Sequence, residues 1–394
     1  MKALVVAPQP FFQYRGTPFS VYYRTLVMSE KGVRIDFLTY GQGMDVDLPG
    51  VRIFRIPAFR FLGPVRIGPS KLKLFLDVFL VARLVWRLLW HRYDVVHAHE
   101  EAIFFCAFLK PLFRFKLIYD MHSSLPQQLT NFKFTRSNRL IGLFKWLEDL
   151  SIRRADAIIT ICPDLADYVL GQLNDPERHF LIENSIFEPV RLKHPAQPSE
   201  PGPALPFDIP AGRPTIVYAG TFESYQGIDL LIEAFRLVRR TRPDAFLILA
   251  GGTPEQVAAF RQQAGPDLDR HAVIHERVDQ TVAKQLVAGA AVQMSPRSSG
   301  TNTPLKIYEQ LSSGVPLVAT DIHSHTQVLT SEVAVLVQPE PADMARGILE
   351  ALADGRDNNP RVRAARALYA ERYSRPVYEG KIERLLQRIR SCAE

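Results

Sequence analysis

The chain has 394 residues, of which 47% are apolar, so it is long enough for two or three domains with proper cores. Its three cysteines form no CxxC pair and have no histidine at metal-ligand spacing, which argues against a disulfide framework or a zinc site and fits a reducing cytoplasm. The net charge of +7 belongs entirely to residues 1–200, which also hold 19 of the 24 phenylalanines. A basic, aromatic-rich half without a nucleic-acid-binding signature favours a membrane over nucleic acid as the anionic partner.

Short β-branched runs alternate with helical patterns through the first half. The expected strands are residues 2–7, 34–39, 51–56, 93–98, 116–119 and 157–161. The expected helices are residues 19–31, 71–91, 101–110, 137–154 and 164–173. This alternation predicts a parallel sheet covered on both faces. The opening MKALVVAPQP has too short an apolar run, and no small-residue cleavage site, for a signal peptide.

A proline-rich stretch, residues 191–213, predicts a linker, after which the same alternation restarts. The expected strands are residues 215–219, 245–250, 272–275, 291–295, 316–320 and 333–337. The expected helices are residues 227–241, 254–264, 282–288, 304–313, 341–353, 361–372 and 375–392. The predicted fold class is therefore α/β, with two Rossmann-like doubly wound domains facing across a cleft. Their bounds are residues 1–190 and 214–374, and we expect a final helix, 375–394, to return to the first domain.

The segment SPRSSGTNTPLKIYEQLSSGVPLVATD, residues 295–321, combines two cations with small polar residues and a helix. Small residues let backbone N–H groups approach an anion closely. Arg297 and Lys306 can neutralise a diphosphate, and Glu309 can accept hydrogen bonds from a ribose. This pattern predicts a nucleotide-sugar site; the alternative is a surface loop followed by an ordinary core helix.

Several motifs resemble those of GT-B glycosyltransferases and, within them, glycosyltransferase family 4. In chain order the motifs are YDVVHAHE, LIYDMHSS, LIENSI, VYAGTFESYQGIDLLIEAF, LILAGG and the 295–321 segment. The resemblance implies retaining transfer of a hexose from a UDP- or GDP-linked donor, without a metal or other cofactor. It makes residues 1–190 the acceptor-binding domain and residues 214–374 the nucleotide-sugar-binding domain.

The expected catalytic residues are His122, Arg297 and Lys306, since charge grows on the leaving diphosphate and the resemblance implies a histidine near the donor sugar. The expected donor-binding residues are Gly16, Gly220, Thr221, Gly300, Thr301, Asn302, Thr303, Pro304, Leu305 and Glu309. Simpler alternatives are a surface ion pair for Arg297 and a plain turn for Gly16. His97 and His99 share one face of a strand, but no third ligand is evident, so we expect them to be structural and assign no metal.

Two positions depart from the family pattern. Thr301 replaces the first glutamate of a Glu-x7-Glu element, and Tyr225 and Gln226 stand where an arginine and a lysine commonly precede the glycine. We expect Lys306 to supply the missing phosphate charge. The departures keep open a noncatalytic partner protein that binds nucleotide-sugar or glycan. A sugar-nucleotide 2-epimerase is a further alternative, although a small soluble substrate needs no basic, aromatic surface.

Residues 71–91 form a strongly amphipathic helical pattern that is too interrupted by charge to span a bilayer. Its polar side chains gather on one face: Lys73, Asp77, Arg83, Arg87 and His91. The rest is apolar and includes Trp86 and Trp90, which predicts a helix in the interface of an anionic membrane. The alternative is a helix whose apolar face is entirely internal. We expect a peripheral protein at the cytoplasmic face of the cell membrane, acting on a lipid-linked or polysaccharide acceptor and not on nucleic acid.

Overall fold

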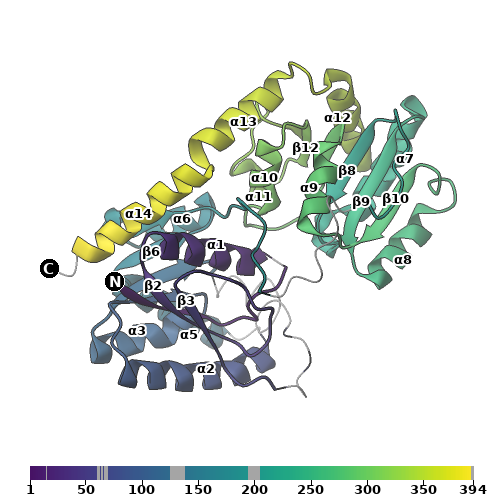
Figure 1. The fold of residues 1–394 in the computed structure, drawn as a ribbon. Coiled ribbons are helices and arrows are strands. Elements are labelled where there is room, and N and C mark those ends of the chain that lie inside the picture. The colour runs from purple at the N-terminus through teal and green to yellow at the C-terminus, as the bar shows by residue number, and fades with distance from the viewer. Residues whose placement is uncertain are drawn as a thin grey trace. The chain divides into compact units, whose positions relative to one another are not determined.

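A computed structural model describes residues 1–14, 16–59, 63, 65, 70–124, 138–193 and 205–391 (Figure 1). The chain divides into two compact units. Unit 1 comprises Met1–Ala196 and Arg375–Glu394, and unit 2 comprises Gln197–Ser374. Residues 194–204 of the expected linker and residues 392–394 of the expected final segment lie outside the described residues.

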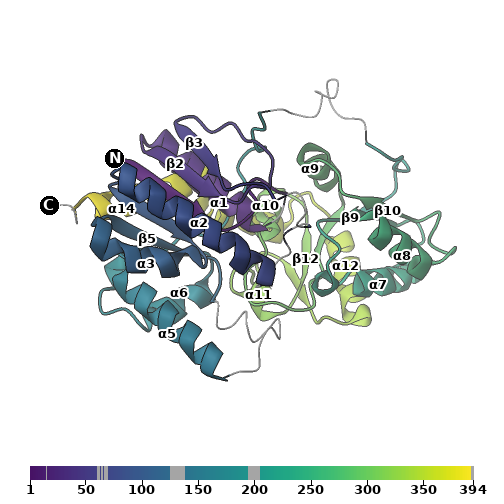
Figure 2. The same cartoon turned by 90° about the horizontal axis from the view of Figure 1, so that it is seen from below.

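Unit 1 is built on a seven-stranded parallel sheet in the order β3-β2-β1-β4-β5-β6-β7. The strands are β1 (Lys2–Ala7), β2 (Arg34–Thr39), β3 (Val51–Arg55), β4 (Val95–His99), β5 (Lys116–Met121), β6 (Ala157–Thr160) and β7 (His179–Leu181). The helices are α1 (Gly16–Glu30), α2 (Lys71–Trp90), α3 (Ala102–Phe113), α5 (Asn138–Arg154), α6 (Pro163–Leu170) and α14 (Arg375–Ser391), with a 3-10 turn at Pro176–Arg178. Helices α2, α3 and α5 cover one face of the sheet, and α1 and α14 cover the other (Figures 1 and 2).

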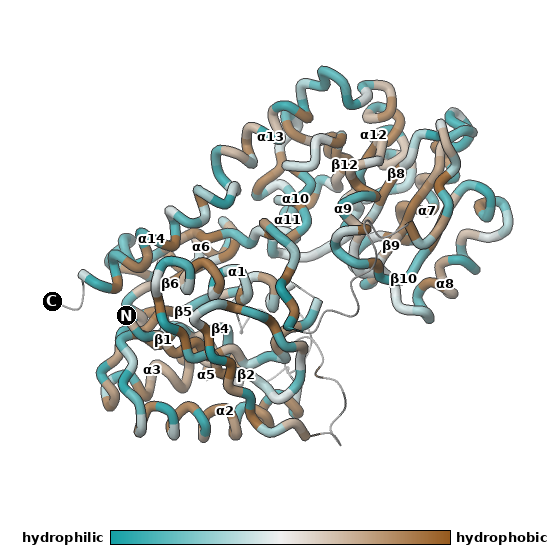
Figure 3. The backbone as a smooth tube through the Cα atoms, in the orientation of Figure 1, coloured by the Kyte–Doolittle hydropathy of each residue, from teal (hydrophilic) through white to brown (hydrophobic). Residues whose placement is uncertain are grey.

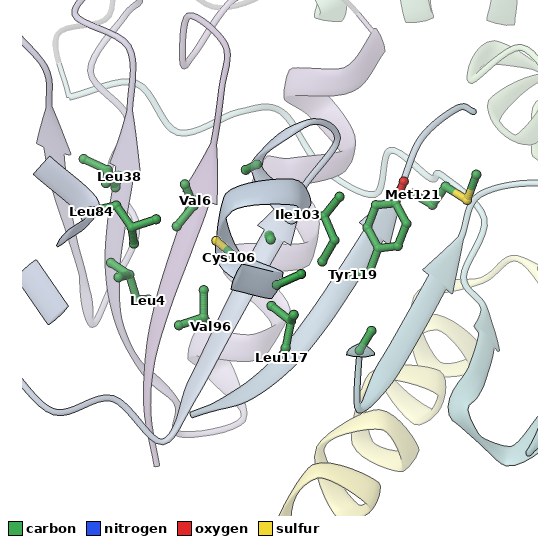
Figure 4. Close-up of a cluster of buried hydrophobic side chains, with 14 of the residues drawn as sticks. Leu4, Val6, Leu38, Leu84, Val96, Ile103, Cys106, Leu117, Tyr119 and Met121 are labelled. Atoms are coloured by element: carbon green, nitrogen blue, oxygen red, sulfur yellow. The ribbon is translucent and has the colours of Figure 1, made fainter. Parts of the chain in front are cut away.

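Apolar side chains fill the layer between this sheet and its helices. Figure 4 shows Leu4 and Val96 of the central strands close to Leu84 of α2 and Cys106 of α3. Central parallel strands are buried on both faces and so read as continuous apolar runs. The same feature appears as brown stretches along the central strands of both sheets in Figure 3.

Unit 2 is built on a six-stranded parallel sheet in the order β10-β9-β8-β11-β12-β13. The strands are β8 (Thr215–Ala219), β9 (Phe246–Gly252), β10 (Ala272–Glu276), β11 (Val292–Ser295), β12 (Leu317–Thr320) and β13 (Val335–Val337). The helices are α7 (Ile228–Thr241), α8 (Pro254–Ala264), α9 (Gln280–Ala288), α10 (Lys306–Ser312), α11 (His323–Thr326), α12 (Pro341–Asp354) and α13 (Pro360–Arg372), with a 3-10 turn at Ser224–Gln226.

Both strand orders match the doubly wound pattern in which the third, second and first strands are followed by the fourth, fifth and sixth. The order reverses between β1 and β4 in unit 1 and between β8 and β11 in unit 2. Ligands of such sheets bind beyond the carboxyl ends of the strands at this point. Gly16 follows β1, Gly220 follows β8 and Arg297 follows β11, so the topology places three candidate residues there. The predicted fold class is confirmed for each unit.

Helix α2 exposes part of its apolar surface and buries part of its polar face. Leu76, Leu80, Leu84 and Leu88 pack into the core, but Lys73 and Arg87 also point inward, with side chains only 13% and 11% exposed. The alternative with an entirely internal apolar face is wrong, because Trp86 and Trp90 are 61% and 67% exposed. Equally, Arg87 pairs with the buried Asp36 and is not a surface cation.

Candidate donor site

The loop after β11 carries most of the expected donor-binding residues. Arg297 folds back over this loop, since its Nε donates to the Ser299 carbonyl at 2.7 Å and its Nη1 donates to the Asn302 carbonyl at 3.0 Å. Its guanidinium carbon also lies 5.0 Å from the ring centre of Tyr225. At Gly300, φ is +126° and a Cβ would lie 2.2 Å from Nη2 of Arg297, so this position requires glycine. Arg297 forms no ion pair with any described residue, which excludes the surface ion pair as its role within the described chain.

Lys306, the first residue of α10, points toward the end of β8. Its Nζ is buried, lies 3.8 Å from the ring centre of Tyr218 and forms no hydrogen bond with the described residues. A Cβ on Gly220 would lie only 3.3 Å from this Nζ. Burial and the nearby Arg297 hold the pKa of Lys306 well below its ordinary value. Because an unpaired buried ammonium is costly, a ligand that brings negative charge is favoured beside it.

The neighbouring loop residues are held mainly through their backbone. The Thr301 carbonyl accepts a hydrogen bond from Gln327 Nε2 at 2.6 Å. Thr303 is buried, and its Oγ1 has no hydrogen-bond partner in the described part of the chain. Four further candidates border the loop at the end of β8 and the start of α10: Gly220, Thr221, Pro304 and Leu305. The structure therefore brings together in unit 2 all the expected donor-binding residues of the second domain except Glu309, which lies further along α10.

Glu309 follows Lys306 by three residues, which places it on the same side of α10. Its side chain is 31% exposed, and its Oε1 lies 3.5 Å from Nζ of Lys284. Burial raises the pKa of Glu309, while Lys284 opposes that shift. Glu309 is thus a partly exposed acceptor at the edge of the loop. In residues 296–309 the only cations are Arg297 and Lys306.

His325 supports this loop from within the unit, although the sequence analysis did not single it out. Its Nδ1 donates to the Thr320 carbonyl at 2.8 Å, and its Nε2 accepts from the Ser295 hydroxyl at 3.0 Å. The Thr320 hydroxyl in turn donates to the Arg297 carbonyl. Burial lowers the pKa of His325 to about 4, so the ring is neutral near pH 7. The two histidines of the four-residue helix α11 match no motif, so only the folded chain reveals this link.

In unit 1, three histidines surround Asp120 at the ends of β4 and β5. Asp120 Oδ2 lies 3.0 Å from His97 Nε2 and 3.2 Å from His99 Nδ1. His122 Nε2 lies 3.2 Å from His99 Nδ1 and 3.3 Å from Asp120 Oδ1. All four side chains are buried. The strand register pairs His99 with Asp120, which brings together residues more than twenty positions apart.

Arg24 of α1 balances the charge of this cluster. Its fully buried guanidinium donates to Asp120 and, at 2.9 Å, to the Ile182 carbonyl. Burial would raise the pKa of Asp120, but Arg24 and the histidines hold it well below its usual range. Burial lowers the pKa of His122 to about 4, so this candidate catalytic histidine is neutral near pH 7. Its proposed contact with the donor sugar stays a prediction.

No third ligand beside His97 and His99 was expected from the sequence, and this expectation is wrong. Asp120 brings a third donor atom, and the three atoms lie within 4.8 Å of one another. However, Asp120 already accepts from Arg24, and a divalent cation would have to lie beside that buried guanidinium. The arrangement therefore fits a hydrogen-bonded network that orients the rings better than it fits a cation site.

Gly16 is the exposed first residue of α1. A Cβ at this position would meet no atom within 4 Å, so packing in unit 1 does not require glycine there. A backbone N–H at a helix N-terminus suits an anion. The expected approach of Gly16 to the donor phosphate stays a prediction.

Known protein families provide the decisive comparison. A family model described as "Glycosyl transferases group 1" matches residues 213–354, and one described as "Glycosyl transferase 4-like domain" matches residues 26–185. The chain belongs to the group 1 glycosyltransferases. Together the two models cover about three quarters of this glycosyltransferase, one in each unit, and the resemblance inferred from its motifs is confirmed.

Individual relatives support the same assignment. The glycosyltransferase is 30% identical over 144 residues to a phosphatidyl-myo-inositol mannosyltransferase of Mycobacterium tuberculosis, a match that spans only 36% of each chain. It is 22% identical over 364 residues to a phosphatidylinositol N-acetylglucosaminyltransferase component of Arabidopsis thaliana, which covers 90% of this chain and 74% of that one. The solved sucrose-phosphate synthase of Thermosynechococcus elongatus superposes with a TM-score of 0.72 and 16% identity over 99% of both chains, which shows the shared GT-B fold.

Proposed function

We propose that this glycosyltransferase moves a hexose from a UDP- or GDP-linked donor to a lipid-linked or polysaccharide acceptor, with retention of anomeric configuration. The observation that carries the proposal is the buried Nζ of Lys306, which has no hydrogen-bond partner among the described residues. It lies at the sheet position where doubly wound folds bind nucleotides. A diphosphate would supply the missing negative charge.

The chemistry needs charge stabilisation on the leaving group. When the bond between sugar and phosphate breaks, negative charge grows on the diphosphate, and Lys306 and Arg297 are positioned to stabilise it. The small side chains at Gly220 and in the loop from Gly300 to Thr303 let phosphate oxygens approach the backbone N–H groups closely. Glu309 would accept hydrogen bonds from the ribose. Lys306 and Arg297 would stabilise the charge on the leaving diphosphate, so the proposal assigns no metal or other cofactor to the reaction.

The acceptor assignment rests on the relatives and on the charge of unit 1. Both curated relatives described above are named for sugar transfer to phosphatidylinositol, which favours a lipid-linked acceptor. The excess positive charge lies in residues 1–200, most of which belong to unit 1. An acceptor in an anionic membrane would be attracted there. The proposed location is the cytoplasmic face of the cell membrane, bound peripherally.

A second candidate is a noncatalytic partner protein that binds nucleotide-sugar. It is favoured by the departures at Thr301 and Gln226, since neither side chain can supply the carboxylate or the cation that the family pattern has there. Arg297 also donates hydrogen bonds to two carbonyl groups of its own loop. A protein of this kind would bind the donor without turning it over. The epimerase alternative has no comparable observation in its favour.

A binding screen followed by a turnover assay tests both candidates. Purified protein is heated with UDP, GDP, ADP and their sugar conjugates, and each hit is checked by calorimetry. We expect one nucleotide to bind clearly and its sugar conjugate to be consumed when membrane lipid extract is added. Binding without consumption would favour the noncatalytic candidate. If no nucleotide bound to well-folded protein, both candidates would be wrong.

A further inference from the structure

Large apolar side chains gather on the outer side of α2, α3 and α5, which lie side by side in Figure 2. In the described part of the chain, ten of the thirteen exposed large apolar side chains belong to these three helices. They are Leu74, Phe75, Val78, Trp86, Leu89 and Trp90 on α2, Phe108 and Leu112 on α3, and Leu143 and Trp146 on α5. Trp86 and Trp90 are 61% and 67% exposed. We call this surface the α2–α3–α5 face; clustered exposure of this kind marks an interaction site.

Three polar side chains of α2, Lys73, Asp77 and Arg87, form an inward-facing stripe that is used inside unit 1 and not on this face. Lys73 forms an ion pair with Glu101 at 2.7 Å. Asp77 accepts from the Tyr40 hydroxyl at 2.6 Å.

Arg87 continues the same stripe toward the other end of the helix. It pairs with Asp36 and donates from Nε to the Tyr93 hydroxyl at 3.0 Å. Lys73, Asp77 and Arg87 thus each have a partner within the unit. The outer side of α2 is left mainly apolar, with Lys71 and Arg83 as its exposed charges, whereas an ordinary surface helix carries charged and polar residues there.

The exposed charges on the three helices all have one sign. They are Lys71, Arg83, Arg139, Lys145 and Arg153. The acidic side chains of the same helices are not fully exposed: Asp77 and Asp149 are half-buried and Glu148 is buried. An apolar surface whose own exposed charges are all cations complements an anionic lipid surface. It would repel a second copy of itself.

We propose that the α2–α3–α5 face inserts its apolar side chains into the surface of an anionic bilayer. This inference rests on the proposed function, because it presumes an acceptor held in a membrane. No described helix is long and apolar enough to cross a membrane, so the face would lie in the interface. Tryptophan favours that region, where its ring meets both lipid tails and headgroups. The inserted apolar side chains hold the protein at the membrane. The inward-facing polar stripe of α2 contributes less, because its charges face the interior of unit 1.

The tryptophans make a direct test possible. The chain has three, Trp86, Trp90 and Trp146, and all of them lie on this face. Intrinsic fluorescence is recorded with vesicles of phosphatidylcholine, with and without a third of phosphatidylglycerol, and with brominated acyl chains as quenchers. We expect a blue shift and quenching by bromine, both stronger with phosphatidylglycerol. Unchanged fluorescence with vesicles at saturating lipid would overturn the proposal.

Two double variants separate the contribution of apolar insertion to vesicle binding from that of electrostatic attraction. Replacing Trp86 and Trp90 by Gln, with Trp146 left as the reporter, should weaken vesicle binding by roughly tenfold, and the loss should persist in high salt. Replacing Arg83 and Lys145 by Glu should weaken binding by roughly tenfold or more at low salt only. The matched control is Leu170→Gln on α6, an exposed leucine outside the face, which should bind like wild type.

Two further readings separate this inference from the proposed function. Nucleotide binding by unit 2 should be the same in all these variants, so loss of vesicle binding alone leaves the donor site standing. Sedimentation without lipid should give one species. A dimer that the Trp86→Gln, Trp90→Gln variant dissociates would assign the face to a second copy and overturn the lipid proposal.

Discussion

Both units bury charged side chains at the carboxyl ends of their central strands, but the two sets are neutralised differently. In unit 1, Asp120 forms an ion pair with Arg24 and lies beside three histidines, so its buried charge is paired, although Arg24 Nε, His97 Nδ1 and His99 Nε2 have no hydrogen-bond partner among the described residues. In unit 2, Lys306 lies beside Tyr218 and Gly220, and no described acid lies against its Nζ. The first arrangement is typical of a structural network, and the second is typical of a site that awaits an anion.

The comparison also shows why a perturbed pKa alone does not mark a site. Asp120 and Lys306 both have pKa values shifted well below their ordinary ranges. For Asp120 the shift arises because partners stabilise the charged form. For Lys306 it arises because burial destabilises the charged form. Only the second case gains from a ligand of opposite charge.

The largest expected effect comes from breaking the ion pair between Arg24 and Asp120. Arg24→Met leaves the buried Asp120 without its cation, which should destabilise unit 1 by about 3–5 kcal/mol. Urea unfolding followed by tryptophan fluorescence measures this, because all three tryptophans belong to unit 1. The control is Lys306→Met, which should leave that transition unchanged. An Arg24→Met transition like that of wild type would show that the network contributes no stability.

Removing Lys306 should lower the turnover rate without destabilising the fold. We expect Lys306→Ala to lower the transfer rate by roughly 100- to 1000-fold, since one preorganised charge-stabilising group is lost. Thermal unfolding should be unchanged or shifted upward, because a costly buried charge is removed. Arg346→Ala, on an exposed ion pair of α12, serves as the control with full activity. Wild-type rates in Lys306→Ala would remove Lys306 from the mechanism.

His325 offers a way to loosen the donor loop without touching its cations. His325→Ala removes the bonds to Ser295 and the Thr320 carbonyl, and we expect the KM for the donor to rise roughly tenfold with a smaller change in kcat. His325→Gln should recover part of the loss, because an amide can replace one of the two bonds. Thr326→Ala, next to it and exposed, is the control. A fall in kcat alone would argue against a positioning role.

The low pKa of Lys306 gives a smaller, pH-dependent effect with a definite sign. A bound diphosphate should raise this pKa, so binding takes up a proton at any pH between the free and bound values. Within that window, affinity should fall as pH rises, by at most about tenfold per pH unit. Calorimetry in buffers of different ionisation enthalpy measures the uptake. Proton release on binding, or a pH-independent affinity across the alkaline range, would contradict this linkage.

Much of the fold follows from periodicity. The expected strands at residues 2–7, 34–39 and 215–219 coincide with β1, β2 and β8, because buried parallel strands are continuous apolar runs bounded by turns. Strand β7 and helix α11 were not predicted, because they have three and four residues and carry too little pattern to recognise.

The candidate donor loop was predictable because its glycine, cations and small residues are contiguous in the sequence. The charge-paired network around Asp120 was not, since His97 and Asp120 meet through the register of β4 and β5, and Arg24 reaches them from helix α1. Helix α2 illustrates the remaining limit. Its amphipathicity was evident, but which side faces the protein depends on buried partners such as Asp36.

The central claim is that Lys306 is a partner for a diphosphate, and calorimetry tests it most directly. Wild type and Lys306→Met are titrated with the nucleoside diphosphate identified by the screen and with its nucleoside. We expect wild type to prefer the diphosphate strongly, and the variant to lose most of that preference while it binds the nucleoside equally well. A variant that keeps the full preference for the diphosphate would contradict the account.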